Sequence, residues 1–343
     1  MRKLLNSLFV TTQGSYLSCD GENVLVKQDG ETKLRVPVHT LESVICFGRV
    51  SCSPPAMRLC GDRGVIISFL SETGRFLARV HGRVSGNVLL RREQYRRSDS
   101  EERSLEVARP IVQAKVANCR TVLKRALRDY PSLSEAPQIE SAVEGIDKVA
   151  KAIQRPSSLD SVRGYEGLAA RLYFSVFDHL IVKQKGDFYL KERSRRPPLD
   201  NTNSLLSFIY TLVTGDIVSA LETVGLDPAV GYLHAERPGR PALALDIAEE
   251  FRSYIADRFV LSLVNRQQVS ARGFQTTETG AVIMDDDTRK TVLVAYQKRK
   301  QDVITHPFLG EKIKLGLLPT AQALLLARFI RGDNDGYPPF IWR

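Results

Sequence analysis

The chain has 343 residues, of which 43% are hydrophobic and 26% charged, so it is long enough for two domains with a substantial core. This composition excludes fibrous and disordered classes, and no apolar run approaches the roughly 18–20 residues that span a bilayer. The apolar run in the first ten residues is too short for a secretory signal, so we expect a cytoplasmic protein. The formal net charge of +10 is compatible with plain solubility, but it also suits a polyanionic partner such as nucleic acid.

Five cysteines, an odd number, are spread along the chain with no C-x-x-C pair. Zinc-ribbon and disulfide-framework interpretations both fail on this spacing. We expect reduced thiols, mostly buried, at Cys19, Cys46, Cys52, Cys60 and Cys119.

Residues 1–90 are predicted to form a β-rich N-terminal domain, which we interpret as sandwich-like. Short alternating runs such as SYLSC, NVLVKQ, TKLRVPV, SVICFG, VIISFL and RFLARV are separated by turn signals such as DGEN, QDGE and SETG. The segment PPAMRLCGDRG at 54–64 interrupts this pattern, because proline at its start and glycine at its end indicate a short helix.

From about residue 88 the hydrophobic period becomes helical. Residues 91–105 are highly charged and are either a linker or the start of the first long helix. Apolar residues then recur at helical spacing over 104–129, among the basic residues of a segment that runs from Lys115 to Arg128. Further helices are predicted at 138–153, 164–184, 203–223, 245–265 and 316–331. The fold class is therefore α+β with two domains, the second (106–343) all-α.

One of the five histidines stands out as a possible ligand. His39 and His81 lie beside short strands, His179 is in an apolar helix, and His306 is in a loop with no adjacent acid, which favours structural or surface roles. Only His234 is followed by a flexible loop and then by a group of acids.

Those acids, Asp246, Glu249 and Glu250, lie in a segment whose apolar residues recur every four positions, so it should be helical with one buried face. Asp246 is about one turn from both glutamates, and carboxylates so placed can converge on a metal. Acids in a first helical turn also simply complement the helix dipole. Periodicity does not decide which of Glu249 and Glu250 would be a ligand.

Two other segments carry candidate chemistry. Glu166 lies between Gly164 and Gly167 at the predicted start of an apolar helix, where it is either a helix-terminal acid or a ligand with close access. The segment 191–213 begins with a basic cluster containing Arg193, Arg195 and Arg196, followed by two prolines and a helix that Asp200 or Asn203 caps. Basic loops are often merely solvated, but this one is also suited to phosphate.

Together these segments resemble the CRISPR-associated integrase family, the Cas-one adaptation endonucleases. The matching motifs are EGLAARLYF (166–174), RRPPLDNTN (195–203) and the G-x-x-H loop leading to LDIAEEF (231–251). N-terminal segments, including LFVTTQGSYLS and PVHTLESVICFG, are similar to those of members from type I-C systems.

The resemblance implies an α+β protein with a β-rich dimerisation domain and a helical catalytic domain. It further implies a homodimer and a Mg²⁺ or Mn²⁺ ion held by Glu166, His234 and Glu249, with Asp246 as a supporting acid; many relatives have aspartate where this chain has Glu249. Oxygen-rich ligation with one imidazole suits these ions better than zinc.

The reaction implied is attack by the 3′-hydroxyl of a short DNA fragment on a phosphodiester at a CRISPR repeat boundary; water in place of the hydroxyl gives nuclease activity. Implied partners are double-stranded DNA and a small second subunit, Cas-two, which bridges two dimers. Arg193, Arg195, Arg196 and the basic helix 115–128 are candidate contacts to the DNA backbone. Two alternatives remain open: a branched-DNA repair nuclease, and a non-catalytic DNA-binding assembly protein of the same fold.

Overall fold

The computed structural model of the chain describes residues 6–72, 76–83, 88–155 and 158–342. Residues 1–5, together with parts of the predicted SETG turn and RFLARV strand, lie outside the described residues. The chain forms two compact units. One comprises Met1–Gly86 and Met284–Asp302, and the other Asn87–Ile283 and Val303–Arg343.

The first unit contains two four-stranded sheets. One has the order β1-β5-β7-β8, in which β1, β5 and β7 are parallel and β8 is antiparallel to β7. The other has the order β4-β3-β2-β6, with antiparallel pairing except between β2 and β6. The strands are β1 (Asn6–Val10), β2 (Tyr16–Asp20), β3 (Asn23–Gln28), β4 (Glu31–Pro37), β5 (Leu41–Phe47), β6 (Ser51–Cys52), β7 (Ile66–Leu70) and β8 (Phe76–Val80).

A single apolar core joins the two sheets of this unit. Val10, Val44 and Ile67 from one sheet cluster with Leu17 and Val24 from the other, and all are at most 4% exposed. The predicted short helix is α1 (Pro54–Asp62), which begins at Ser53 because the Ser53 hydroxyl accepts the Ala56 N–H. Alternation of apolar residues therefore located six of the eight strands, while β1 and β6 were not predicted from it.

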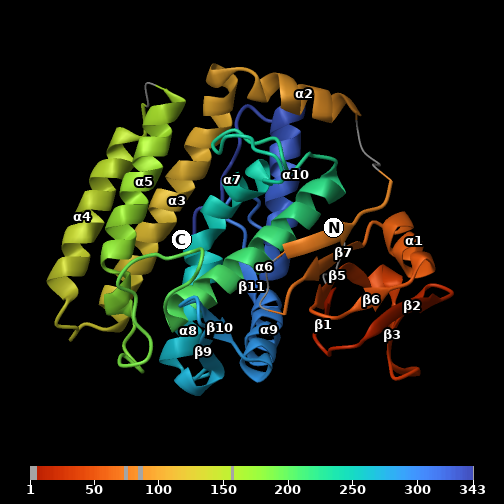
Figure 1. Ribbon diagram of the computed structural model, residues 1–343. Helices are drawn as coiled ribbons and strands as arrows, with labels where there is room; N and C mark the ends of the chain where they lie inside the picture. The colour runs from red at the N-terminus through yellow and green to blue at the C-terminus, as the bar shows by residue number, and fades with distance from the viewer. Residues whose placement is uncertain (1–5, 73–75, 84–87, 156–157, 343) are drawn as a thin grey trace. The chain divides into compact units, whose positions relative to one another are not determined.

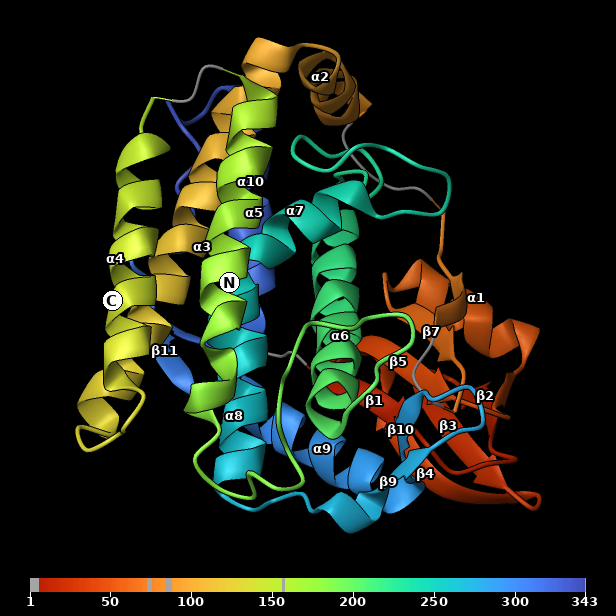
Figure 2. The same ribbon diagram turned by 60° about the vertical axis from the view of Figure 1, so that its left-hand side comes forward.

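The second unit is built mainly of helices, and the longest of them is central to it. α3 packs against α4, α5 and α7 (Figures 1 and 2). The helices are α2 (Val88–Ser98), α3 (Glu101–Asp129), α4 (Ala136–Ala152), α5 (Leu159–Ser175), α6 (Asn201–Val224), α7 (Ala242–Phe251), α8 (Arg258–Asn265) and α10 (Leu318–Arg331). Short 3₁₀ turns lie at Val38–Thr40, Phe177–Leu180, Ala271–Gly273 and Leu315–Leu317.

The predicted helix over 245–265 is interrupted at the residues that follow Phe251. α7 and α8 are separated by a π-helical turn, Arg252–Asp257. Such turns insert one extra residue and so change the direction in which the following side chains point, and they are frequent at functional sites.

The second unit is not purely helical, which corrects the all-α prediction. Two short ribbons pair β9 (Phe274–Thr276) with β10 (Val282–Met284), and β11 (Val303–Thr305) with β12 (Lys312–Lys314). Their turns use glycines with positive φ, Gly280 and Gly310, which indicates hairpin chemistry. Between the ribbons, α9 (Asp286–Lys300) was not predicted, and it groups with the first unit.

α6 is long and apolar enough to cross a membrane by length and composition, with a mean hydropathy of 1.6. In the structure 67% of its apolar window is buried inside the protein, where Leu205, Leu206 and Ile209 are fully buried. α6 therefore belongs to the core of the second unit. Its start confirms the predicted cap, because the Asp200 carboxylate accepts the Asn203 N–H at 2.6 Å.

Candidate active site

Glu166 lies inside α5 and not at its beginning. A capping box formed by Ser158 and Ser161 starts the helix at Leu159, so Glu166 is two turns further along. This corrects the predicted start at 164 and removes the interpretation of Glu166 as a helix-terminal acid. Its half-buried side chain is 25% exposed and pairs with Lys115 of α3.

The three acids of α7 are also interior, because the helix begins at Ala242 and has no acid in its first turn. Asp246, Glu249 and Glu250 are all at most 1% exposed. Interaction with the helix dipole therefore does not explain them, and each buried carboxylate requires its own partners.

Asp246 organises the loop that carries His234. Its carboxylate accepts the backbone N–H groups of Tyr232, Leu233 and His234 at 2.6, 3.0 and 2.9 Å. The same carboxylate is 2.7 Å from His234 Nδ1. Gly231 makes this close approach possible, because a Cβ there would lie 2.8 Å from Asp246 Oδ2. With Nδ1 committed to Asp246, Nε2 is the ring nitrogen that can act as a ligand.

The carboxylates of Glu166 and Glu249 meet on one buried cation. Lys115 is 6% exposed, and its Nζ lies 2.7 Å from Glu249 Oε2 and in direct contact with Glu166 Oε1. His234 Nε2 lies 3.8 Å from Glu249 Oε1. Helices α3, α5 and α7 and the loop before α7 thus converge at this point.

Arg252, the first residue of the π-helical turn, supplies a second cation. Its guanidinium contacts Glu249 Oε1 and lies over the Tyr210 ring, 5.3 Å from the centroid. Burial alone would raise the pKa of Glu249, but the charges of Arg252 and Lys115 outweigh burial and lower that pKa below its usual range. The carboxylate of Glu249 is therefore ionised.

Both Glu249 oxygens are buried and lack a hydrogen bond of good geometry, although each is in ion-pair contact with a cation. Oxygens in this state retain lone pairs for a further cation. Among the residues that the structure describes, no group of three His, Cys, Asp or Glu side chains is already arranged around a common point as metal ligands. Instead, Lys115 Nζ lies between the two glutamate carboxylates.

Glu250 faces a different set of partners. Its carboxylate accepts the Tyr337 O–H at 2.6 Å, the Phe340 N–H at 2.7 Å and an N–H of Gln322 at 2.9 Å. His306, expected to be a loop histidine without an acid, is fully buried and lies 2.9 Å from Gln322 Oε1. Glu250 therefore holds the C-terminal segment, and its oxygens do not point at Lys115.

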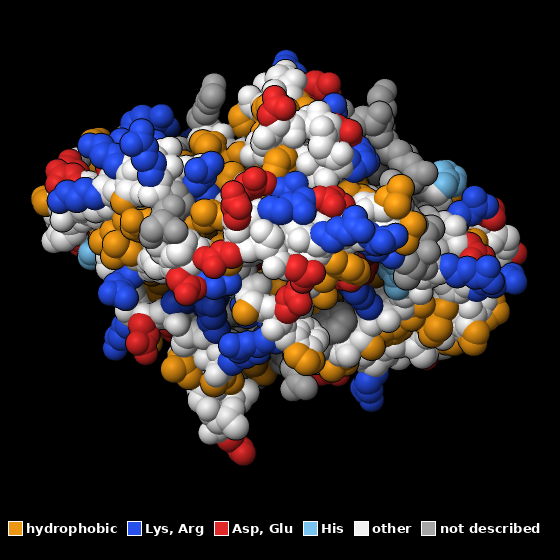
Figure 3. All heavy atoms as spheres, turned by 90° about the horizontal axis from the view of Figure 1, so that it is seen from above, with side chains coloured by type: hydrophobic (Ala, Val, Ile, Leu, Met, Phe, Trp, Pro, Cys, Tyr) orange, Lys and Arg blue, Asp and Glu red, His pale blue; other side chains and the backbone are white. Residues whose placement is uncertain are grey.

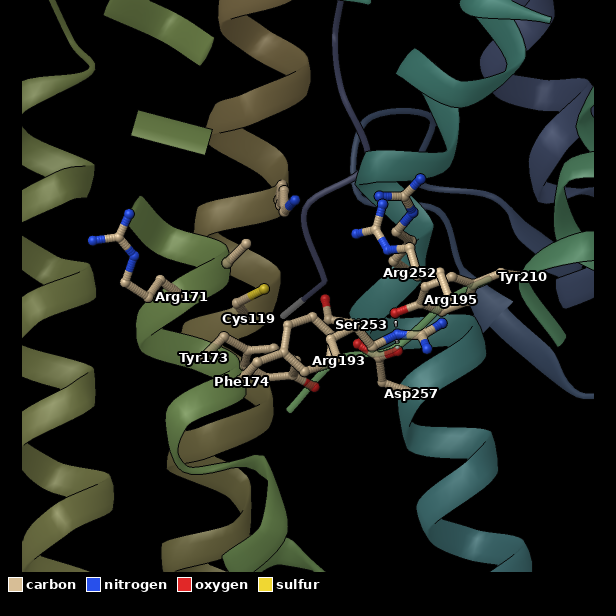
Figure 4. A pocket seen from close by; sticks show the side chains of 12 residues that line it. Cys119, Arg171, Tyr173, Phe174, Arg193, Arg195, Tyr210, Arg252, Ser253 and Asp257 are labelled. Atoms are coloured by element: carbon tan, nitrogen blue, oxygen red, sulfur yellow. Dashed lines mark hydrogen bonds between the residues drawn. The ribbon is translucent and has the colours of Figure 1, made fainter. Parts of the chain in front are cut away.

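A pocket of about 230 Å³ adjoins the carboxylates and shares Lys115 and Arg252 with them. Figure 4 shows Tyr173, Phe174 and Cys119 on one side and Arg252, Ser253 and Asp257 on the other, with Arg171 pointing away. The lining contains five basic side chains and a single acid, Asp257. A cationic and aromatic lining of this kind suits a phosphate and a base of nucleic acid.

Within the pocket, Tyr210 links the arginines to the acid. Its hydroxyl donates to Asp257 at 2.7 Å, and the guanidinium of Arg193 lies 5.1 Å from its ring centroid. Burial raises the pKa of Asp257 to about 6.

The three predicted backbone contacts differ in availability. Arg193 is half-buried and donates to Asn203 at 2.5 Å and to the Ser194 carbonyl at 2.6 Å, so much of its hydrogen-bonding capacity is used inside the protein. Arg195 is exposed and lines the pocket, whereas Arg196 is exposed and does not line it. On the face in Figure 3, Lys and Arg side chains alternate with Asp and Glu and do not form one continuous patch.

The other histidines and the cysteines were not expected to bind a metal. His39 and His81 are exposed, and His179 is half-buried. All five cysteines are free, and burial raises the pKa of Cys46, Cys60 and Cys119 to about 12.

Sequence reasoning missed Lys115 and Arg252 as site residues. Lys115 was grouped with possible DNA contacts, yet it falls on the apolar stripe of its helix, four positions after Ile111 and four before Cys119. A lone cation on a buried face indicates a buried acidic partner, and this signal was present in the sequence.

Comparison with a family profile and with individual proteins points to the same family. The sequence profile of the family described as "CRISPR associated protein Cas1" matches residues 8–298. A CRISPR-associated endonuclease Cas1 from Chlorobaculum tepidum is 54% identical over 343 residues, which is 100% of each chain.

Two solved structures share the fold at low identity. A casposase bound to an integration product has a TM-score of 0.83 at 20% identity, covering 99% of this chain and 94% of that one. A Cas6-RT-Cas1–Cas2 complex has a TM-score of 0.84 at 21% identity, covering all of this chain and 36% of the other. These two likenesses concern the fold alone.

Proposed function

Since the chain belongs to the Cas1 family of CRISPR-associated proteins, we propose that it is a divalent-metal-dependent DNA endonuclease and integrase that inserts short DNA fragments into a CRISPR array. Full-length identity of 54% to a CRISPR-associated endonuclease supports the activity. The observation that carries the site assignment is the convergence of Glu166 and Glu249, from two different helices, on one buried cation.

Glu166, His234 and Glu249 would hold the ion, and Mg²⁺ and Mn²⁺ suit this oxygen-rich set. Two features support the fit: the Glu249 oxygens lack hydrogen bonds, and His234 Nε2 lies 3.8 Å from Glu249 Oε1. When bound, such an ion polarises a phosphodiester and stabilises the negative charge that develops on it. Asp246 would act by orienting His234, and Glu250 would take no part in ligation.

The chain's own residues would position the DNA. The exposed Arg195 and the half-buried Arg252 present positive charge on the pocket side of the carboxylates, where a phosphate would lie. In integration, the oxygen of a fragment's 3′-hydroxyl forms a bond to phosphorus as the bond to the target strand's 3′ oxygen breaks. That leaving oxygen takes up a proton and becomes a new 3′-hydroxyl. Attack by water instead gives hydrolysis.

We further propose the assembly and setting. Residues 1–90 would form a dimerisation domain and 106–343 the catalytic domain of a cytoplasmic homodimer from a type I-C-like system. The partner would be a small Cas-two subunit that bridges two dimers. The fold shared with the Cas6-RT-Cas1–Cas2 complex is compatible with such an assembly.

The test is a strand-transfer assay with the partner subunit, short duplex DNA and a supercoiled plasmid that carries a CRISPR repeat, in Mn²⁺ or Mg²⁺. Glu166→Gln, His234→Ala and Glu249→Gln are expected to lose integration and cleavage while DNA binding persists. Lys148→Ala, at an exposed position of α4, is the matched surface control for activity. Joining by His234→Ala at the wild-type rate would show that the site is assigned wrongly.

The same assay separates the alternative functions. Cleavage of branched junctions without any integration product would favour a repair nuclease. Absence of metal-linked heat in calorimetry, both for the wild type and for Glu166→Ala, would favour a non-catalytic binding protein.

A further inference from the structure

We propose that Lys115 is an exchangeable counter-ion of the active site: its ammonium neutralises Glu166 and Glu249 when no metal is bound, and it moves toward the adjoining pocket when a divalent ion binds. This inference rests on the proposed function, since it assumes that the two glutamates are metal ligands. It concerns how the chain couples metal binding to DNA binding, and Lys115 is a positioning residue in it.

The first step concerns the carboxylate oxygens with which Lys115 pairs. Its Nζ contacts Glu166 Oε1 and lies 2.7 Å from Glu249 Oε2, the same carboxylate oxygens that a metal would require. A divalent ion held by those oxygens would lie close to an ammonium that stayed in place, and like charges at close range repel strongly in a buried site. The ammonium and the metal therefore exclude each other.

The second step is the cost of leaving the site without a cation. Glu249 is 1% exposed and is in ion-pair contact with Lys115 and Arg252, and removing a partner from such a buried charge strongly destabilises a protein. Arg252 is in direct ion-pair contact with Glu249, whereas its effect on Glu166 is through space. Lys115, which reaches both glutamates from α3, allows α5 and α7 to pack in the absence of metal.

The third step is where the displaced ammonium goes. Lys115 also lines the pocket of about 230 Å³, where Arg193 and Arg195 contribute further positive charge and Asp257 is the single acid of the lining. An ammonium in that pocket is poorly compensated until an anion arrives. A DNA phosphate supplies the missing charge, so metal and DNA should each strengthen binding of the other through Lys115.

Manganese binding to the full-length protein, measured by calorimetry with Mn²⁺ alone and then with a short duplex carrying a 3′ overhang, tests this inference. Lys115→Met, which keeps most of the aliphatic length but removes the charge, is expected to bind Mn²⁺ about tenfold more tightly than the wild type without DNA. DNA should raise the Mn²⁺ affinity of the wild type and raise that of the variant much less. Lys148→Met, at an exposed position of α4, is the matched control and should behave as the wild type.

Melting temperature gives a readout independent of catalysis. Metal-free Lys115→Met should melt several degrees below the wild type, and saturating Mn²⁺ should remove the difference. If that variant folds only with Mn²⁺, the inference is supported. If Mn²⁺ does not rescue its folding, Lys115→Gln takes its place in the titration, with the same tighter binding expected.

Equal or weaker Mn²⁺ binding by the uncharged variants, with binding still lost in Glu249→Gln, would overturn this inference and leave the proposed metal site intact. Absence of Mn²⁺ binding in every protein, wild type included, would overturn the metal site and this inference with it.

Discussion

Glu249 and Glu250 are consecutive residues of α7, are equally buried, and have opposite surroundings. Glu249 lies among cations, Lys115 and Arg252, with His234 nearby. Glu250 lies among neutral donors, the Tyr337 hydroxyl, the Gln322 amide and the Phe340 N–H. One helix thus presents a face with charged partners and a face with neutral partners.

The difference follows from helix geometry. Consecutive residues point about 100° apart, so one side of α7 meets α3 and the His234 loop, and another meets the C-terminal segment. Charged partners hold the pKa of Glu249 low, whereas burial without a cation raises the pKa of Glu250 to about 7. Chemistry at a carboxylate depends on its neighbours more than on its position along the chain.

The largest expected effect is the difference in activity between the two glutamine variants. Glu249→Gln should lower metal-dependent integration and cleavage by about 10³-fold, because a metal ligand contributes several kcal/mol of transition-state stabilisation. Glu250→Gln should stay within about threefold of the wild type once folding is confirmed by circular dichroism. Comparable losses in both variants would erase the distinction between the two faces.

Glu250, whose replacement should hardly affect activity, should matter for the stability of the fold. Glu250→Ala leaves the Tyr337 hydroxyl and the Phe340 N–H without their acceptor, and we expect a loss of roughly 3 kcal/mol in the free energy of unfolding. Urea denaturation measures this loss, with the exposed Glu140→Ala as control, expected within about 0.5 kcal/mol of wild type. A Glu250→Ala protein as stable as the control would contradict the structural role.

Asp246 should have an intermediate effect on the charged face. Asp246→Asn weakens the hold on His234 Nδ1, and loss of such an orienting partner typically reduces metal affinity by about 10–100-fold. Calorimetric titration with Mn²⁺ measures the change. Unaltered affinity would mean that His234 does not depend on Asp246 for its orientation.

A smaller effect is the pH dependence of stability that Glu250 causes. Because the pKa of Glu250 is raised above that of an unfolded glutamate, its contribution to stability is fully present below about pH 4.5 and is lost as pH rises through about 7. Glu250→Gln mimics the protonated form at every pH. From about pH 5 to about pH 8, wild-type stability should therefore fall relative to the variant by roughly 1–3 kcal/mol, measured by urea denaturation. A constant difference would show that Glu250 is ionised throughout.

The sequence allowed the fold class, most elements and the identity of the candidate ligands to be predicted. Alternation located β2, β3 and β5, and the Asp200 cap located the start of α6, because these are local signals. The motifs around Glu166 and His234 were specific only in combination.

What escaped prediction depends on contacts between distant segments. The meeting of Glu166 with Glu249 is set by how α5 and α7 each pack on α3. The role of Glu250 is set by a segment almost ninety residues further along, and periodicity was unable to separate it from Glu249. Lys115 was the exception. Its place on the apolar stripe of α3 was visible in the sequence, but it was not interpreted as a sign of a buried acidic partner.

Anomalous diffraction from a crystal soaked in Mn²⁺ tests the central claim most directly. We expect one manganese peak within coordination distance of the carboxylates of Glu166 and Glu249 and of His234 Nε2, with the Lys115 ammonium moved off those oxygens and Glu250 still bound to Tyr337. A peak at Glu250, or Lys115 still bridging both glutamates in a crystal whose manganese lies elsewhere, would contradict the account.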